Sequence, residues 1–147
     1  MTVTLRDVTK DNYDLICDLE VLESQEDFVS INAYTLAQAY YEGFTVQAIY
    51  HQETPIGLIM WTKPLSQKVE IWRLMIDQKY QSQGFGRKAL TQAIARIIDE
   101  HCVQKIEISY DPTNHLAKEF YRTIGFIERG MDADNEEMLA TLTVMNA

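Results

Sequence analysis

The sequence predicts one α/β domain in which helices pack against a mixed sheet. Three observations lead to this fold class. The 147 residues contain no linker, repeat or low-complexity segment, strand-like and helix-like patterns alternate along the chain, and the most apolar strand pattern lies in its middle. A chain of this length can bury one core of ordinary size. We therefore expect residues 1–147 to form a single domain.

The first half of the chain predicts a strand, two helices and then three strands. Alternating apolar residues mark the first strand, and cap residues before an apolar face mark the first helix. A glycine ends the second helix, and the third strand of the following group is apolar toward its end, as a central strand should be. The expected elements are a strand at 2–8, a helix after 9–11 that carries Leu15, Ile16, Leu19 and Leu22, a helix around 34–43, and strands at 44–51, 55–63 and 68–77.

The second half predicts a long helix, a strand, a shorter helix and two final strands. The long helix follows two glycines and carries an apolar stripe with helical spacing. The shorter helix begins at an asparagine cap and closes at Gly125. The order of elements is therefore β-α-α-β-β-β-α-β-α-β-β, and the members of this half are a helix from 85, a strand at 105–110, a helix at 114–124, a strand from 126 and a strand near 136–144.

The composition narrows the class of function. The net charge of −9 argues against nucleic acid as a partner, because proteins usually bind nucleic acid through a basic surface. A small polycationic partner fits this charge, although an acidic surface also serves solubility alone. No apolar run approaches the length of a membrane span, and the first ten residues lack the pattern of a secretory signal. Two separated cysteines, Cys17 and Cys102, favour a reduced, cytoplasmic protein.

The glycine pair at Gly84 and Gly86 is compatible with three kinds of phosphate loop. The stretch fits the dinucleotide fingerprint in its letters, but residues 78–83 separate it from the preceding strand, and Glu107 lies inside a strand pattern instead of at its end. A magnesium-dependent phosphate loop needs Ser or Thr after its lysine, whereas alanine follows Lys88. Both interpretations fit poorly.

The third kind of loop binds a diphosphate through the start of a helix. Glycines allow close approach of the backbone, and free N–H groups at a helix N-terminus attract an anion. A helix entry without a ligand also explains this loop alone. A second pattern follows about thirty residues later in "NHLAKEFYRTIGF", in which Asn114 and Tyr121 are seven residues apart and share a helix face. Together, Gln81-x-x-Gly84-x-Gly86 and this segment closely resemble the two coenzyme segments of the GNAT superfamily of N-acetyltransferases.

The resemblance implies that acetyl-CoA is the cosubstrate and that a splayed pair of central strands holds it. The edge of the strand at 68–77 would pair with the pantetheine arm, and main-chain N–H groups of the glycine loop would surround the diphosphate. The residues implied for the coenzyme are Leu74, Met75, Ile76, Ser82, Gln83, Gly84, Phe85, Gly86, Arg87 and Asn114.

Direct transfer of an acetyl group needs a proton acceptor and a proton donor. An alkylamine has a pKa near 10.4 and must lose a proton before it attacks. The resemblance places Tyr121 near the coenzyme sulfur as the acid for the departing thiolate, and it places Glu70 at the position of the catalytic glutamate of histone-type members. Glu70 could equally be a surface residue, with a water chain as the base. The histidines lack metal-ligand spacing, so no metal is expected.

The acceptor is expected to be a small amine. The segments 23–42 and 72–90 resemble the corresponding parts of bacterial spermidine/spermine acetyltransferases of the superfamily. Carboxylates and aromatic faces attract a flexible polycation, and the residues we assign to it are Glu23, Glu26, Tyr34 and Trp72. The same residues also fit a solvated helix and ordinary rim packing. Another small amine, a protein amine and a non-catalytic acyl-CoA sensor remain as alternatives. Strand edges near the C-terminus are compatible with a homodimer.

Overall fold

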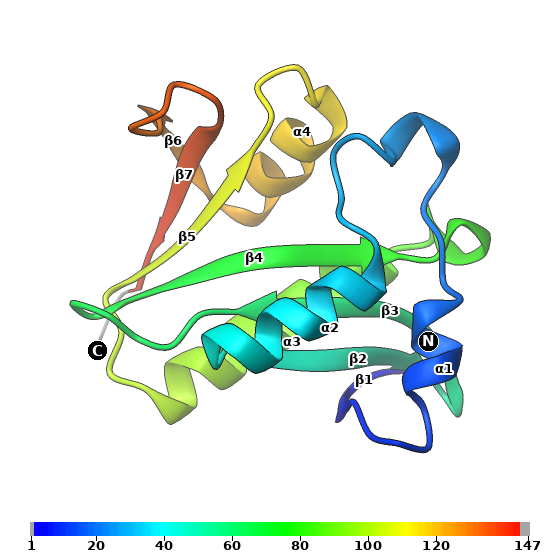
Figure 1. Cartoon of the computed structure of the whole chain (residues 1–147). Coiled ribbons are helices and arrows are strands. Elements are labelled where there is room, and N and C mark those ends of the chain that lie inside the picture. The colour runs from blue at the N-terminus through cyan, green and yellow to red at the C-terminus, as the bar shows by residue number, and fades with distance from the viewer. Residues whose placement is uncertain (1, 145–147) are drawn as a thin grey trace.

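A seven-stranded mixed sheet with helices on both faces makes up the computed structural model, which describes residues 2–144 (Figure 1). The strand order across the sheet is β1-β2-β3-β4-β5-β7-β6. The chain order confirms the predicted one, with β1 Val3–Asp7, α1 Tyr13–Cys17, the 3-10 turn η1 Glu23–Gln25, α2 Asn32–Glu42, β2 Thr45–His51, β3 Thr54–Trp61, β4 Lys68–Ile76, the 3-10 turn η2 Gln78–Tyr80, α3 Phe85–Glu100, β5 Lys105–Tyr110, α4 His115–Ile124, β6 Ile127–Met131 and β7 Met138–Thr143.

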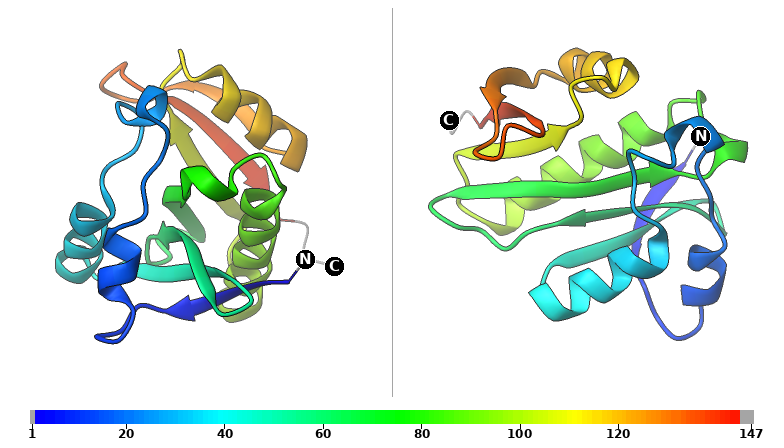
Figure 2. Two further views of the ribbon diagram at one scale, coloured as in Figure 1. Left: turned by 90° about the vertical axis from the view of Figure 1, so that its right-hand side faces the viewer. Right: turned by 45° about the horizontal axis from the view of Figure 1, so that its top comes forward.

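The helices divide between the two faces of the sheet. α1 and α2 cover one face, whereas α3 and α4 cover the other (Figures 1 and 2). Alternate side chains of a strand point to opposite faces, so neighbours such as Leu58 and Ile59 enter different cores. The larger core, which contains Ile59 and Ile106, lies under α3 and α4. Burial on both faces explains why β3 is an almost continuous apolar run.

The two central parallel strands separate partway along their length. β4 and β5 pair only from Lys68 opposite Lys105 to Ile71 opposite Ile108, yet β4 continues to Ile76. Figure 1 shows the resulting opening between β4 and the β5–β7 part of the sheet. This confirms the splayed strand pair that the sequence resemblance implied.

A β-bulge lies in β4 where the opening begins. Met60 of β3 pairs with Arg73 and Trp61 pairs with Ile71, so Trp72 is the extra residue. A bulge bends its strand and re-aims its side chains. The Trp72 ring packs edge-on against Phe44 with ring centroids 4.8 Å apart.

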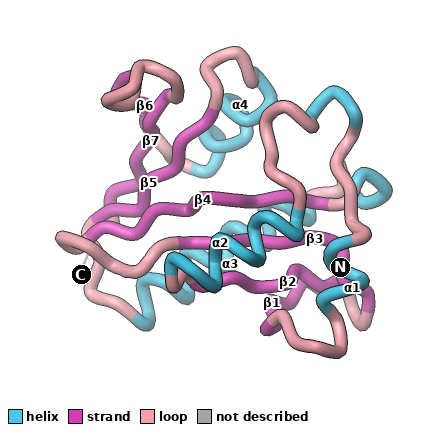
Figure 3. The backbone as a smooth tube through the Cα atoms, in the orientation of Figure 1, coloured by secondary structure: helices cyan, strands magenta, loops and turns pink. Residues whose placement is uncertain are grey.

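The first helix is shorter than predicted. α1 ends at Cys17, so Leu19 and Leu22 lie outside it, and Leu15 is 55% exposed. Tertiary hydrogen bonds replace helical ones here, because the Glu20 N–H donates to Asp77 Oδ1 over 2.9 Å. Residues 18–31, which we call the strap, therefore leave α1 and run as a loop with one 3-10 turn before α2 begins (Figure 3).

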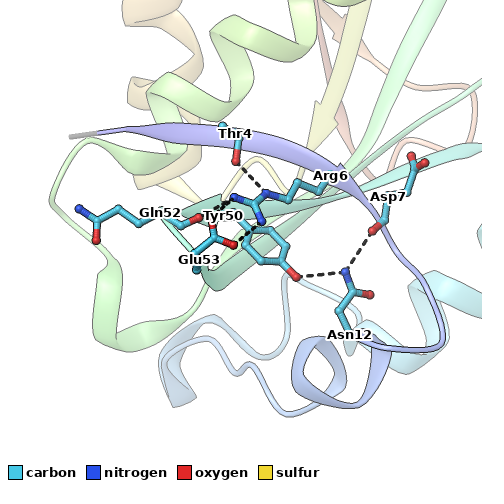
Figure 4. Close-up of polar contacts among 7 residues, drawn as sticks. All are labelled: Thr4, Arg6, Asp7, Asn12, Tyr50, Gln52 and Glu53. Atoms are coloured by element: carbon cyan, nitrogen blue, oxygen red, sulfur yellow. Dashed lines mark hydrogen bonds and ion pairs between the residues drawn. The ribbon is translucent and has the colours of Figure 1, made fainter.

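A polar cluster ties the edge strand β1 to the hairpin between β2 and β3. Arg6 donates to both carboxylate oxygens of Glu53 and to the Gln52 carbonyl, and its guanidinium lies 4.2 Å from the centre of the Tyr50 ring (Figure 4). Asn12 Nδ2 donates to the Tyr50 hydroxyl. The cluster lies away from the opening between β4 and β5.

We expect Gly57→Ala to destabilise the protein by about 3 kcal/mol, because overpacking in a tight core has costs of this order. A Cβ atom at Gly57 would lie 2.3 Å from the Met75 carbonyl oxygen, which is main chain and cannot rotate away. β4 would have to shift away from β3. Chemical denaturation measures the free energy of unfolding, and a loss below about 0.5 kcal/mol, the usual size for a surface change, would contradict this close approach.

Candidate active site

A cleft of about 780 Å³ lies where the sheet opens. Its walls are the end of β4, the turn that leads into α3, the start of α4 and the strap. Ten residues predicted for the coenzyme or its chemistry line it together, although they come from three separate segments: Leu74, Met75, Ile76, Ser82, Gly84, Phe85, Gly86, Arg87, Asn114 and Tyr121.

The turn before α3 presents main-chain N–H groups to this cleft. Ser82 and Gly84 both have positive φ, at 62° and 87°, and turns of this kind form concave anion sites. Gly84 is the N-cap of α3 and supplies no side-chain hydrogen bond. The first N–H groups of the helix therefore have no acceptor within it, and the positive end of its dipole faces the cleft. This geometry suits a diphosphate.

Two loop residues have side chains directed elsewhere. The Arg87 guanidinium donates to the Thr123 hydroxyl over 3.0 Å and to the Thr123 carbonyl over 3.2 Å, which links α3 to α4. Gln83 does not line the cleft, and its amide donates to the Lys79 carbonyl. Any contact of these residues with a diphosphate therefore depends on their main-chain N–H groups.

Asn114 begins α4 and faces the same cleft. Its Oδ1 accepts a hydrogen bond from the Ala117 N–H over 3.2 Å, so it is a true N-cap. The cap occupies the side-chain oxygen and leaves the amide nitrogen to point to a ligand. Helix capping and the predicted coenzyme contact are thus compatible in one residue.

Tyr121 lies in an aromatic cluster on the α4 wall of the cleft. Its ring is stacked on Tyr110 with centroids 5.9 Å apart and packs edge-on against Phe120 and Phe126. Burial raises the pKa of Tyr121 to about 12. Within residues 2–144 its hydroxyl forms no hydrogen bond. The phenol therefore stays protonated at neutral pH and has a proton to donate.

A second, smaller cavity of about 160 Å³ follows the cleft along β4. Residues 70–72 of β4 and 107–109 of β5 line it, together with Asp132 and Leu139. Residues 74–76 line the large cleft, so the small cavity lies nearer to the paired part of β4 and β5 than the large cleft does. Glu70 and Trp72 therefore belong to the small cavity, and Tyr121 belongs to the large one.

Glu70 and Glu107 stand side by side on the two parallel strands, and Lys68 lies between their carboxylates. Its Nζ is 3.3 Å from Glu70 Oε1 and 3.4 Å from Glu107 Oε1. Partial burial alone would raise the pKa of Glu70, but the hydrogen bond from Trp72 and the charge of Lys68 outweigh it and lower the pKa. Burial, reinforced by the negative Glu70, raises the pKa of Glu107. The ionised form is therefore favoured at Glu70 and disfavoured at Glu107.

Three residues predicted for the acceptor lie outside both cavities. Glu23 and Glu26 lie on the strap with exposed side chains, and Tyr34 lies on α2 with 57% of its surface exposed. The cavity linings instead include residues that sequence reasoning missed, namely Gln25 and Phe28 of the strap and Glu107. Glu107 could have been found, because it alternates with two isoleucines in a strand that follows β4 through a helix, a connection typical of parallel strands. The strap residues carry no comparable pattern.

Two further findings concern residues 2–144. None of the helices in this range is both long and apolar enough to cross a membrane. The same range contains no group of three or more His, Cys, Asp or Glu residues arranged to hold a metal ion.

The fold and the cleft define the class of the protein. A parallel strand pair opens beside α3, whose glycine N-cap supplies no side-chain hydrogen bond, and α4 carries Asn114 and Tyr121 into the same space. The profile of the acetyltransferase (GNAT) family matches residues 9–126. The chain belongs to this family and is an acetyltransferase.

The chain is also similar to individual acetyltransferases. It is 25% identical to the spermine/spermidine N(1)-acetyltransferase of Bacillus subtilis, with 95% of this chain and 97% of that protein covered. It is 26% identical to the L-2,4-diaminobutyric acid acetyltransferase of Wolinella succinogenes, with 67% and 68% covered. Among solved structures, the paiA N-acetyltransferase of Thermoplasma acidophilum in complex with coenzyme A has a TM-score of 0.74 at 14% identity, over 98% of this chain and 100% of that chain.

Proposed function

We propose that the protein transfers the acetyl group of acetyl-CoA to a primary amine of a polyamine such as spermidine or spermine, by direct attack in a ternary complex. The observation that carries the proposal is the large cleft, in which the glycine turn, the open edge of β4 and Tyr121 face one space. The relative that acts on spermine and spermidine matches nearly the whole chain and supports the choice of acceptor.

The reaction forms one N–C bond and breaks one C–S bond. The ammonium of the acceptor loses a proton to become a free amine, and the nitrogen lone pair attacks the thioester carbonyl. The attacking nitrogen then loses a second proton as the tetrahedral intermediate collapses and expels the coenzyme thiolate. Tyr121 gives its phenolic proton to that thiolate. The phenolate is then protonated again, either by solvent or by a proton that the amine has lost. Main-chain N–H groups of β4 next to the bulge polarise the carbonyl oxygen.

The small cavity would receive the amine. Glu70 and Asp132 offer carboxylates, and Trp72 adds an aromatic wall. A cationic amino group is attracted to such a site. Glu70 is the proposed base because it stays ionised and can accept a proton from the ammonium, either directly or through a water molecule.

Arg73 favours a second candidate acceptor, a diamino acid. This half-buried residue follows the bulge; its guanidinium donates to Gln38 and to the Trp72 carbonyl, and its buried Nε atom has no partner among residues 2–144. Arg73 lines neither cavity, so a substrate carboxylate would pair with its guanidinium only after the side chain turned toward the opening. A substrate with both an amine and a carboxylate would resemble that of the diaminobutyric acid acetyltransferases.

A panel of amines tests the proposal. Purified protein is incubated with acetyl-CoA and with spermidine, spermine, putrescine, L-2,4-diaminobutyrate or an N-terminal peptide. Because Cys17 and Cys102 are free thiols, product mass is followed instead of thiol release alone. We expect acetylated spermidine or spermine, with the rate reduced at least about 10-fold in Glu70→Gln, since general bases contribute about 100-fold or more.

The other outcomes separate the alternatives. Turnover with diaminobutyrate alone favours the second candidate, and turnover with the peptide alone favours a protein amine. Tight binding of acetyl-CoA in calorimetry without transfer to any amine favours a non-catalytic sensor. The cytoplasmic location and the homodimer also remain proposals, and light scattering during size-exclusion chromatography tests the dimer.

A further inference from the structure

The strap forms one wall of the large cleft. It is also hydrogen-bonded to residues just before the glycine turn. Val21, Gln25 and Phe28 line the cleft from this side. Among residues 2–144, the strap forms hydrogen bonds within itself and with α1 and α2, and its remaining hydrogen bonds all involve Asp77, Gln78 or Gln81. These three residues lead directly into the glycine turn.

Two side-chain amides make the central contact. Gln25 Nε2 donates to Gln81 Oε1 over 3.1 Å, and Gln81 Nε2 donates back to Gln25 Oε1 over 2.9 Å. Gln81 Nε2 also donates to the Ile76 carbonyl, and Gln25 Oε1 also accepts the Leu22 N–H. Each amide therefore has only one orientation that satisfies all its partners.

A buried carboxylate reinforces this contact. Asp77 is 7% exposed. Its Oδ1 accepts the Glu20 N–H of the strap, and its Oδ2 accepts the Lys79 N–H of η2. The Gln78 N–H donates to the Glu20 carbonyl over 2.7 Å. The strap and the turn that precedes α3 are thus joined at two points, one through Asp77 and one through the glutamine pair.

We propose that Gln25 is a positioning residue that couples coenzyme binding at the glycine turn to the position of the strap over the acyl end of the cleft. This inference rests on the proposed function. A diphosphate on the N–H groups of residues 82–87 would hold Gln81 in place, and Gln81 would hold Gln25. Because coupling between two sites is reciprocal, a well-placed strap also strengthens coenzyme binding.

The composition of the strap supports this coupling. Phe28 and Leu22 remain 40% and 43% exposed, so the apolar packing of the strap is incomplete in the free protein. Segments with few buried apolar contacts open at low free energy. The pantetheine arm of a bound coenzyme would cover part of this apolar surface, and the glutamine pair holds the strap beside the cleft in which the coenzyme would bind.

Hydrogen–deuterium exchange with saturating coenzyme A tests the coupling. In the wild-type protein, we expect exchange of peptides from the strap to slow by about 5-fold on coenzyme binding, the effect of roughly one neutral hydrogen bond. In Gln25→Ala, this slowing should be lost while coenzyme still binds, with a Kd about 5-fold weaker. Gln92→Ala is the matched control, because it removes a similar part-buried hydrogen bond, to the Val3 carbonyl, on another side of α3.

The outcomes decide the inference separately from the proposed function. Strap exchange that is insensitive to coenzyme in the wild-type protein, or that slows equally in Gln25→Ala, would overturn the coupling. Loss of the slowing in Gln92→Ala as well would show a general loss of stability and would overturn it too. Coenzyme binding without acetyl transfer overturns only the proposed function, whereas a wild-type protein that does not bind coenzyme overturns both.

Discussion

Replacing Tyr121 with phenylalanine is expected to lower kcat about 100- to 1,000-fold, the range for loss of a general acid, and to leave coenzyme affinity within about 2-fold. The phenyl ring keeps the stacking on Tyr110 and the contacts with Phe120 and Phe126. Only the hydroxyl is lost, and it forms no hydrogen bond within residues 2–144. Steady-state kinetics with spermidine and calorimetry with coenzyme A measure the two effects.

The raised pKa of Tyr121 determines how the rate of acetyl transfer should depend on pH. Because burial raises the pKa of Tyr121 to about 12, the phenol keeps its proton throughout the range in which the enzyme can be assayed. Deprotonation of Tyr121 would impair donation only as pH approaches that value. We therefore expect kcat/KM to rise with pH through neutrality as the amine loses its proton, without a falling limb from this tyrosine.

Tyr110→Phe is the matched control for this experiment. Tyr110 contributes the stacked ring, but its hydroxyl donates to Glu128 on β6 and lies outside the cleft lining. Its loss should affect stability more than kcat. If Tyr121→Phe retained more than about a tenth of the wild-type kcat, a fall smaller than general acids usually give, its assignment as the acid would be wrong.

Gly84→Val is expected to weaken coenzyme binding roughly 10- to 100-fold, because one hydrogen bond to a charged group is worth about 1.5–3 kcal/mol. A Cβ at this position would meet no atom within 4 Å, so the effect is not a clash. Gly84 has a φ of 87°, which a β-branched residue scarcely adopts. The turn would change its conformation and redirect the first N–H groups of α3. Calorimetry with coenzyme A measures the loss.

Two variants separate this effect from general strain. Gly84→Asn should bind coenzyme within about 5-fold of the wild type, because asparagine tolerates the left-handed conformation. Gly130→Val introduces comparable backbone strain at a φ of 123° in β6, also with open space around it. It should lower stability and leave coenzyme affinity unchanged. Equal binding by Gly84→Val and the wild type would exclude the glycine turn as the diphosphate site.

Local patterns were sufficient to predict the order of elements. β5 and the cap and end of α4 agree with the prediction, because each depends on a short signal such as Asn114 or an alternating apolar run. α1 was predicted too long because Leu19 and Leu22 fit a helical spacing. Hydrogen bonds to a segment almost sixty residues away determine its true end, and a local pattern does not contain them.

The candidate site was predictable where it depends on a contiguous motif. The glycine turn and α4 supplied most of the cleft lining, since spacing within one helix determines a shared face. The strap was not predictable, because Gln25 and Gln81 meet only after the strap folds over the end of β4. Glu23 and Glu26 were predicted to bind the acceptor because of their charge. The neutral residues between and beside them line the cleft instead.

A structure of the protein with bound acetyl-CoA would show whether the glycine turn and Tyr121 contact the coenzyme. We expect diphosphate oxygens within about 2.7–3.2 Å of main-chain nitrogens of residues 82–87, and a thioester sulfur that faces the Tyr121 hydroxyl across the opening between β4 and β5. A coenzyme bound outside this cleft, or a Tyr121 hydroxyl turned away from the sulfur, would contradict this expectation.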